Sequence, residues 1–432
     1  IDAVPDVTNV QVQVLTSAPS LAPLEMERQV TFPVEVAMSG LPDVEEIRSV
    51  SKFGLSAVTI VFDDSVDTYF ARQLVLERLA AAREQIPDSI GSPEMGPIST
   101  GLGEIYQYEL RAAPDSGYDA KSLRTVQDWN VRRQLLGVAG ATEINSFGGF
   151  EKQFQVQLDP AKLQSYGLTL RDVYESISRN NANVGGAYIQ KGSEQYLLRG
   201  IGLVENPEDI GNIVVKTGKE GVPVYVKDVG EIVEGSTVRQ GAVTSNGEGE
   251  IVAGIVLMLK GENSRTVVNN VKERVETVKK SLPKGVELVP FYDRTELIDR
   301  AIATVEKNLI EGAILVIVVL MLLLGNWRGA LLVATIIPLS MLFAAILMRI
   351  FNVSGNLMSL GALDFGLIVD GAVVMVENTI RRRAEAQHEA ELSGHREVAQ
   401  RTILESCLEV ARPVVFAVAI IAIVYLPILS LR

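Results

Sequence analysis

The stretch from Asn356 to Thr379 constrains this chain more than any other. It is about two dozen residues long and contains no Lys, Arg or Pro, so it can cross a bilayer as a helix. It nevertheless carries Asp364 and Asp370, with Glu377 near its far end. A carboxylate at mid-membrane costs about 2.5–3.5 kcal/mol even on the most lenient insertion scale. A segment that holds two of them is predicted to do more than anchor the chain.

Helix geometry limits what these carboxylates can do together. Asp364 and Asp370 are separated by about 9 Å along the axis and about 120° around it, whereas Asp370 and Glu377 lie about 10 Å apart on nearly the same face. A single metal ion needs its oxygen ligands within about 2.0–2.6 Å, so these residues cannot chelate one ion together. Each can hold a proton, because burial favours the neutral form of a carboxyl group. We therefore predict a proton relay.

A second interpretation of the same residues is purely structural. Polar side chains can hold membrane helices together, and small residues on one face let helices approach closely. The small residues of this stretch are Gly361, Gly366, Gly371 and Ala372. The other three apolar runs of the chain have no charged residue in their cores, so a charge partner for the aspartates must come from outside this chain.

The stretch resembles the fourth transmembrane helix of the heavy-metal-efflux RND (resistance–nodulation–division) transporters. The motifs that carry the resemblance are Asn-Leu-Met-Ser-Leu-Gly at 356–361, Asp-Phe-Gly at 364–366, Asp-Gly-Ala at 370–372 and Val-Glu-Asn at 376–378. They are similar to the cobalt–zinc–cadmium branch; the copper–silver branch has Ala-Ile-Gly and Asp-Ala-Ala instead. The resemblance implies that Asp364 and Asp370 shuttle protons, that Glu377 is a third acidic position, and that a lysine elsewhere in the protein faces them.

Composition excludes several other classes. The net charge of −13 argues against nucleic acid as a partner. Cys407 is the single cysteine, so no internal disulfide holds the chain together. The chain has no starting Met, opens in strand-like sequence and ends in an apolar run. We therefore expect a piece of a longer protein that lacks the first transmembrane helix.

Residues 1–100 are predicted to form a ferredoxin-like unit of order β-α-β-β-α-β. Apolar periodicity predicts the following strands and helices in turn: Val7–Leu15, Leu21–Met38, Ile47–Phe53, Ala57–Phe62 and Asp67–Gln85. A last strand is expected between Pro87 and Pro97. Pro33 is expected to bend the first helix, and Asp67 or Thr68 to cap the second.

The pattern then repeats. Residues 40–49 align with 137–146, so that Glu46 falls on Glu143, and the next predicted strand, Phe154–Leu158, ends at Asp159 as its counterpart ends at Asp63. We predict a second ferredoxin-like unit from 101–181 and 249–310, interrupted by an insertion at 182–248. The resemblance identifies that insertion as a docking subdomain, which builds trimer contacts and faces the outer-membrane partner; the alternative is an elaborated loop without a role of its own.

Residues 311–432 are predicted to form an α-helical transmembrane bundle. Crossings are expected at about 311–325, 330–350, 356–379 and 413–430, with a cytoplasmic loop at 380–412. Arg328 and the cluster Arg381–Arg383 both fall on one side of the membrane, two crossings apart. By the positive-inside rule that side is cytoplasmic, which places residues 1–310 in the periplasm.

Candidate metal ligands outside the acidic stretch are few. His388 and His395, the only histidines, are seven residues apart and are interpreted as solvated side chains rather than ligands; Cys407 is interpreted as a small packing residue. Glu143 and Asp159 are weak candidates, at the edges of strands expected to pair. They could form an ion path, although their counterparts in the first unit favour a structural role.

The resemblance implies a secondary active transporter, not an enzyme, that exports divalent cations such as zinc, cobalt or cadmium in exchange for protons. It also implies a homotrimer in the bacterial inner membrane, without a cofactor, that works with a periplasmic adaptor (membrane fusion protein) and an outer-membrane channel. Efflux of organic compounds, or of monovalent copper and silver, is the alternative. An intramembrane aspartyl protease also uses two membrane aspartates, but these lie on neighbouring helices, close enough to share a water, whereas here they are about 9 Å apart on one helix.

Overall fold

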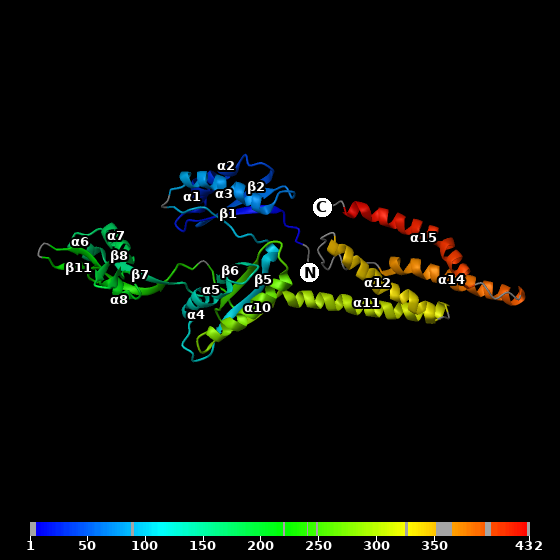
Figure 1. Ribbon diagram of the computed structural model, residues 1–432. Coiled ribbons are helices and arrows are strands. Elements are labelled where there is room, and N and C mark those ends of the chain that lie inside the picture. Colours follow the sequence, from blue (N-terminus) through cyan, green and yellow to red (C-terminus); the bar gives the residue numbers. More distant parts are fainter. Residues whose placement is uncertain are drawn as a thin grey trace. The chain divides into compact units, whose positions relative to one another are not determined.

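The computed structural model describes the chain in two compact units. The described residues are 6–87, 90–218, 221–239, 241–247, 249–324, 327–350, 365–393 and 399–429. The first unit comprises Ile1–Gly103, Leu259–Asn269 and Asp293–Arg432, and the second comprises Glu104–Met258 and Asn270–Tyr292. Figure 1 shows the helices and strands of both units, which are described here one at a time.

The amino-terminal part of the first unit is a four-stranded antiparallel sheet covered by helices. Its elements are β1 (Val10–Ser17), α1 (Pro23–Met26), η1 (Glu27–Thr31), α2 (Phe32–Met38), β2 (Val44–Lys52), β3 (Leu55–Phe62), α3 (Thr68–Gln85) and β4 (Glu94–Met95). The strand order is β2-β3-β1-β4. Alternate residues of β1 (Val10, Val12 and Val14) point into the core, as the period of a half-buried strand requires.

The predicted helix cap of this part is confirmed. Asp67 caps α3, because its carboxylate accepts hydrogen bonds from the backbone N–H groups of Tyr69 (2.9 Å) and Phe70 (3.0 Å). The bend expected at Pro33 stays a prediction; the helix contains a π-helical segment, η1, which ends two residues before Pro33.

The second unit contains a sheet with the same arrangement of strands. Its elements are β5 (Glu104–Ala112), α4 (Ala120–Val126), η3 (Gln127–Val131), α5 (Arg132–Leu135), β6 (Ala141–Phe147), β13 (Val252–Met258), α10 (Ser264–Ser281) and β14 (Val286–Asp293). The strand order is β14-β5-β13-β6. When β5, β6, β13 and β14 are numbered one to four along the chain and the order is read from the β6 edge, it is the same as that of the first sheet. The first helix again contains a π-helical segment, η3.

The inserted part begins earlier than predicted. The strand expected at Phe154–Leu158 is present as β7 (Lys152–Leu158), but it pairs antiparallel with β12 (Gly230–Ser236) in a separate sheet. Gly148 and Gly149 have φ of +71° and +68°, and a Cβ on Gly149 would meet Ala120 O at 2.6 Å, so glycine alone lets the chain leave β6 at this angle. The insertion therefore starts at β7, before the predicted boundary at residue 182.

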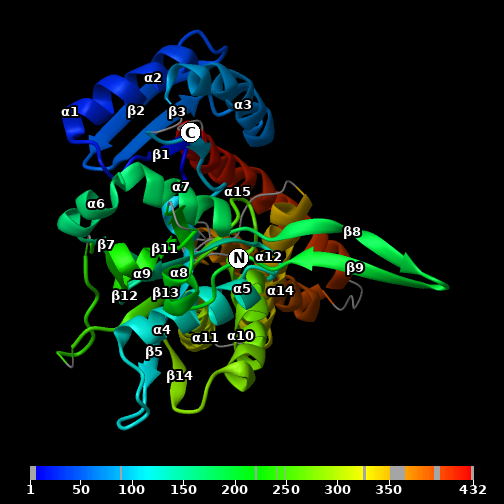
Figure 2. The same cartoon turned by 90° about the vertical axis from the view of Figure 1, so that its left-hand side faces the viewer.

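The inserted part has its own small core. Its remaining elements are α6 (Pro160–Tyr166), α7 (Leu170–Asn180), β8 (Val184–Lys191), β9 (Glu194–Gly200), α8 (Pro207–Gly211), β10 (Val214–Thr217), β11 (Pro223–Tyr225) and α9 (Val226–Val229). Buried side chains including Val173, Ile210 and Val226 pack together. The strands β8 and β9 form a long two-stranded ribbon (Figure 2), and every one of their residues is exposed.

The carboxyl-terminal part of the first unit is helical. The described helices are α11 (Arg294–Leu324), α12 (Trp327–Ile350), α14 (Phe365–Ser393) and α15 (Ala399–Leu429). Among the described residues, α12 is the one helix that is long and apolar enough to cross a membrane by length and composition. Residues 380–412, predicted as a loop with helical pattern, are helical wherever they are described, because α14 runs to Ser393 and α15 starts at Ala399.

Candidate functional site

The predicted relay residues fall on and before α14. Asp370 lies on this helix, five positions after its first residue, Phe365. Glu377 lies two helical turns further on and is exposed. Asp364 lies outside the described residues. The described part of the site is therefore one helix with two acidic positions on nearly the same face.

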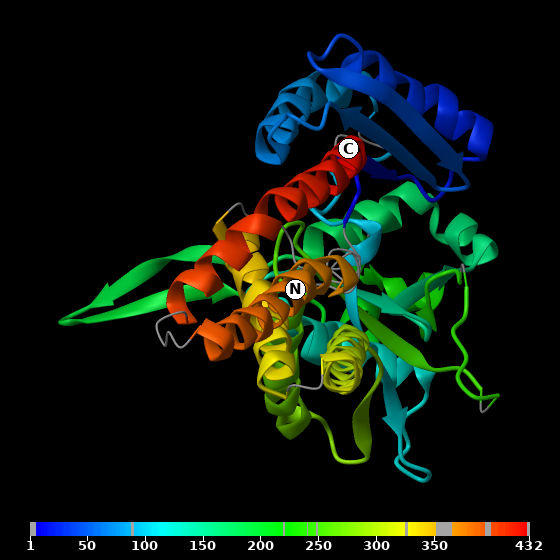
Figure 3. The ribbon, with the colours of Figure 1, turned by 90° about the vertical axis from the view of Figure 1, so that its right-hand side faces the viewer.

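Helix α14 is held from two sides next to Asp370. On one side Ala372, Val373 and Val376 pack against Ala330 and Val333, which are both fully buried on α12. On the other side Gly371 faces α15: a Cβ there would lie 3.1 Å from Val414 Cγ1. Figure 3 shows α14 beside both neighbouring helices. The small residues that follow Asp370 thus allow the close approach of two helices, as their pattern predicted.

Two residues that follow Asp370 on α14 are exposed in the described part of the chain. On a helix, position 374 is rotated by about 40° from position 370, and position 377 by about 20°. Val374 is 42% exposed and Glu377 is exposed as well. The charge partner expected from outside the chain stays a prediction.

A set of polar contacts that the sequence did not indicate ties α14 to α15 beyond Glu377. Asn378 is 9% exposed, and its Nδ2 donates a hydrogen bond to the carbonyl of Ser406 at 2.9 Å. Arg381 donates to Asn378 Oδ1 at 2.9 Å, so both ends of the amide are satisfied. Cys407 Sγ lies 3.6 Å from Thr379 Oγ1. Cys407 is thus a packing residue between two helices, in line with its predicted role.

An ion pair completes this contact. Arg382 Nη2 donates to Glu409 Oε1 at 2.8 Å and Arg382 Nε to Oε2 at 3.1 Å, a two-pronged arrangement. The hydrogen bonds from Arg382 lower the pKa of Glu409. Both side chains are about half exposed, so the pair orients the two helices more than it stabilises them.

The weaker candidates Glu143 and Asp159 do not lie on strands that pair with each other, so this part of the prediction is wrong. Glu143 lies on β6, which pairs with β13, whereas Asp159 follows β7, which pairs with β12. Asp159 caps α6 by accepting hydrogen bonds from the N–H groups of Ala161 (2.8 Å) and Lys162 (3.3 Å). Its counterpart Asp63 accepts from Ser65, and these hydrogen bonds lower the pKa of Asp63. Both aspartates end a strand and start a turn.

The described residues contain no group of three His, Cys, Asp or Glu side chains that could hold a metal ion. His388 is exposed on α14, and His395 lies outside the described ranges. The interpretation of His388 as a solvated residue agrees with its exposure.

Comparison with known proteins identifies the family. The family model described as AcrB/AcrD/AcrF family matches residues 1–432. The chain belongs to the AcrB/AcrD/AcrF family. Within the family it is 52% identical to the cobalt-zinc-cadmium resistance protein CzcA of Cupriavidus metallidurans, over all of this chain and 41% of the relative. It is 38% identical to the cation efflux system protein CusA of Escherichia coli K12, again over all of this chain and 41% of the relative.

A solved structure of a family member has the same fold. A crystal structure of a heavy metal efflux pump, crystal form II, superposes with a TM-score of 0.86 at 38% identity, over all of this chain and 41% of that one. The recognition of a heavy-metal-efflux RND transporter from the motifs of residues 356–378 is thereby confirmed. The chain spans about two fifths of the length of the relatives it matches.

Proposed function

We propose that the full-length protein exports divalent heavy-metal cations such as zinc, cobalt or cadmium across the cell envelope in exchange for protons. The observation that carries this proposal is α14, a helix with Asp370 beside two close helix contacts, in a chain 52% identical to a cobalt-zinc-cadmium resistance protein. The proton carriers are Asp364, Asp370 and, less critically, Glu377. The transported metal ion and the protons are substrates, and the protein is not an enzyme.

The packing of α14 supplies a way for proton binding to change the shape of the protein. A carboxylate at position 370 carries a full charge, which a protonated carboxyl group lacks, so protonation changes how α14 is solvated and which neighbours it attracts. Because Gly371 lies against Val414 and Ala372 lies in the cluster with Ala330, a small shift of α14 must move α12 or α15. This coupling would pass from the membrane helices to the periplasmic part through α11, which is continuous from Arg294 to Leu324.

We also assign the parts of the chain from these arrangements. The two sheets with helices on the β-α-β-β-α-β pattern are proposed as ferredoxin-like units in the periplasm, and the part from β7 to β12 as the docking subdomain. The helices α11, α12, α14 and α15 are proposed to cross the bacterial inner membrane. Arg328 and Arg381 then lie on the cytoplasmic side by the positive-inside rule.

The ribbon of β8 and β9 supports an assembly of several copies. A two-stranded hairpin is marginally stable alone, and this one exposes large apolar side chains such as Tyr188 (58%), Ile189 (54%) and Leu197 (72%). Apolar side chains gathered on an exposed strand pair mark a contact with another chain. We propose that the ribbon contacts a second copy in a homotrimer, which works with a periplasmic adaptor and an outer-membrane channel.

Efflux of monovalent copper or silver is the second candidate, because the chain is also 38% identical to CusA. The higher identity to CzcA disfavours it. Residues 1–310 contain no Cys, so they offer Cu(I) no thiolate, and three of their four methionine thioethers (Met26, Met38 and Met258) are buried. Carboxylates and carbonyls suit harder divalent ions. Export of organic compounds is the third candidate, and the family match alone does not separate it from metal export.

Transport by the full-length protein in proteoliposomes separates these candidates. With an imposed pH gradient and a metal-sensitive dye inside, we expect uptake of zinc, cobalt or cadmium that is lost when the gradient is collapsed. Uptake of silver in preference to all three divalent ions would overturn the assignment in favour of the second candidate. Transport of an organic dye with no metal transport would favour the third.

A further inference from the structure

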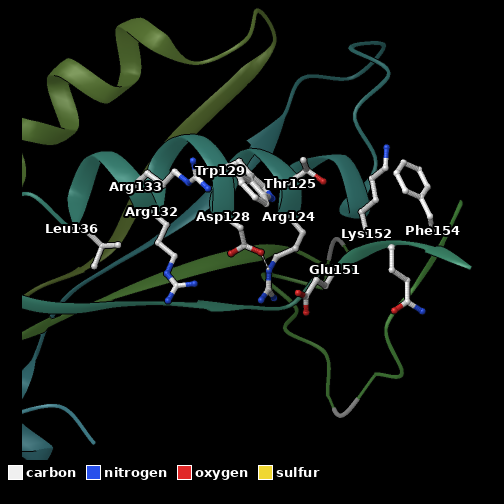
Figure 4. A pocket seen from close by; sticks show the side chains of 11 residues that line it. Arg124, Thr125, Asp128, Trp129, Arg132, Arg133, Leu136, Glu151, Lys152 and Phe154 are labelled. Carbon is white, nitrogen blue, oxygen red and sulfur yellow. Dashed lines mark hydrogen bonds and ion pairs between the residues drawn. The ribbon is translucent and has the colours of Figure 1, made fainter. Parts of the chain in front are cut away.

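A cavity of about 500 Å³ lies beside the helix of α4, η3 and α5 in the second unit (Figure 4). One wall is the helix face from Arg124 to Leu136, and the other is the start of β7 with the residue before it, from Glu151 to Phe154. None of these residues belongs to the acidic stretch or to the proposed transport site. The cavity lies wholly within the second unit.

The helix wall is distorted at the centre of the cavity. Residues Gln127–Val131 form a π-helical turn, a local irregularity that often marks a functional site. Within this turn Gln127 points inward and is fully buried, whereas Trp129 points outward and is 65% exposed. The guanidinium of Arg133 lies over the Trp129 ring, 4.1 Å from its centroid. A large aromatic side chain is thus held at the surface by its own neighbour.

Hydrogen bonds hold the side chains of the helix wall in place. Asp128 accepts from Ser146 Oγ at 2.6 Å and from Arg124 Nε at 2.7 Å, and Arg124 donates a further bond to the Gly148 carbonyl at 2.9 Å. Asp128 and Arg124 are each about four-fifths buried. A wall that is already ordered loses little conformational entropy when a ligand binds.

Two of the cations at the cavity have no carboxylate partner in the part of the chain that the structure describes. Arg124 is paired with Asp128, and Lys152 with Glu234 at 2.6 Å. Arg132 and Arg133 are exposed, and neither forms an ion pair with any residue in the described ranges. Figure 4 shows that Arg132 extends to the same side of the helix as Arg124. In a chain of net charge −13, this is a local surplus of positive charge around an exposed tryptophan.

We propose that this cavity binds an acidic peptide segment of a partner protein. Two carboxylates of the segment pair with Arg132 and Arg133, and an apolar or aromatic side chain packs against Trp129. Guanidinium groups match carboxylates with two parallel hydrogen bonds, and Trp and Arg are the residues that dominate the energy of protein–protein contacts. An exposed tryptophan beside two arginines that form no ion pair in the described ranges, on an ordered wall, is what such a contact requires.

A peptide fits the cavity better than a phosphate group or a lipid surface. A phosphate group concentrates its charge at one point and offers no apolar group to Trp129, whereas the carboxylates of a peptide can reach Arg132 and Arg133 separately. Glu151 can accept a hydrogen bond from a backbone N–H group of a peptide. Trp129 stands among charged side chains rather than on a continuous apolar face, so it does not form a surface that would enter a bilayer.

The test measures peptide binding to the full-length protein in detergent. The probe is a fluorescein-labelled peptide of sequence Glu-Asp-Phe-Glu-Leu-Asp, and its anisotropy is followed as protein is added. We expect saturable binding that weakens at least about tenfold in Arg132→Glu and in Trp129→Ala, since central contacts of this kind cost about 1.4 kcal/mol or more when removed. Arg132→Lys should bind with intermediate affinity because it keeps the charge but not the two-pronged geometry.

Matched controls separate the cavity from general surface charge. Arg171→Glu changes another exposed arginine, on α7 of the same unit, and should alter binding by less than about twofold. A peptide with Lys in place of each acidic residue should not bind. Arg132 and Trp129 are exposed, so both variants should elute and unfold like the parent; Arg133→Gln serves as an independent third variant.

Three results would overturn the proposal. The first is equal binding by the parent and Arg132→Glu, or no saturation up to about 1 mM protein. The second is complete competition by inorganic phosphate at the peptide's own concentration, which would mean a simple anion site. The third is binding of phosphatidylglycerol vesicles with the same dependence on Arg132 and Trp129 but no binding of the peptide.

Discussion

The buried pair Tyr108 and Gln127 gives a quantitative test of the second unit's core. Both side chains are fully buried. The Tyr108 hydroxyl donates to Gln127 Oε1 at 3.1 Å and accepts from Nε2 at 3.0 Å, and Gln127 Nε2 also lies 3.3 Å from Ser146 Oγ. Burial raises the pKa of Tyr108, so its hydroxyl stays protonated and can donate at any physiological pH.

Removing both partners should cost less than the sum of the two single removals. Tyr108→Phe leaves Gln127 Oε1 without its donor, and Gln127→Leu leaves a buried hydroxyl, so each should lower the free energy of opening by about 1–3 kcal/mol. The loss in the double variant should be smaller than the sum of the two single losses by a coupling energy of about 1–2 kcal/mol, because no buried polar group is left unpaired. Native-state hydrogen exchange of the β5 and β13 amides in the full-length protein measures these energies, since a single unfolding transition is not expected in a chain of several domains. Strictly additive losses would refute the reasoning.

Three further predictions concern other parts of the chain. Asp67→Ala should lower the local stability of α3 by about 0.5–2 kcal/mol, measured by hydrogen exchange, whereas loss of protection in α10 as well would contradict a local capping role. The hydrogen bonds from Lys152 and Lys121 lower the pKa of Glu234 below the usual glutamate value of 4.5. The stabilisation that these bonds give to the β7–β12 sheet is therefore complete above pH 4.5 and is lost as the pH falls through the lowered pKa. Glu234→Gln should remove this acid sensitivity, which hydrogen exchange of the β7 and β12 amides measures. Replacing residues 184–200 with a short Gly-Ser linker should leave the β7–β12 sheet intact, because Asn183 Oδ1 accepts a hydrogen bond from Gly202 N at 3.0 Å across the base of the ribbon. The same replacement should prevent trimer formation in cross-linking, and normal trimers would exclude the ribbon as the contact.

The strands and helices of the first sheet could be predicted because short-range chemistry determines them. The alternation of Val10, Val12 and Val14 gives a half-buried strand, and Asp67 is a good helix cap in any context. The acidic transmembrane helix could also be predicted from the sequence, because carboxylates in a long apolar run are rare and costly.

The pairing of β7 could not be predicted in the same way. A strand has the same alternation whichever sheet it joins, and the alignment of Asp159 with Asp63 reflects a shared turn rather than a shared partner. What redirects β7 is the left-handed backbone of Gly148 and Gly149, and in sequence two adjacent glycines indicate a turn but not its direction.

The contacts between α14 and α15 were also missed, since Asn378 and Ser406 are far apart in sequence and neither is unusual where it stands. The cavity of the second unit depends on a π-helical turn whose register leaves no recognisable pattern in the sequence. Both features rest on tertiary packing, which spacing along one chain does not report.

The central claim is that Asp370 carries the protons that drive metal export. The Asp370→Asn substitution keeps the size and hydrogen-bonding capacity of the side chain but removes its titratable proton, so folding and insertion into the membrane should survive. Glu377→Gln, on the same helix and at an exposed position, is the matched control and should lose much less activity.

The decisive measurement uses the full-length protein in proteoliposomes with an imposed pH gradient, a pH-sensitive dye and zinc or cobalt as substrate. We predict that Asp370→Asn abolishes both proton movement and metal transport, while metal binding to the periplasmic part stays unchanged. Coupled proton and metal transport at the parent rate by the Asp370→Asn protein would contradict the account.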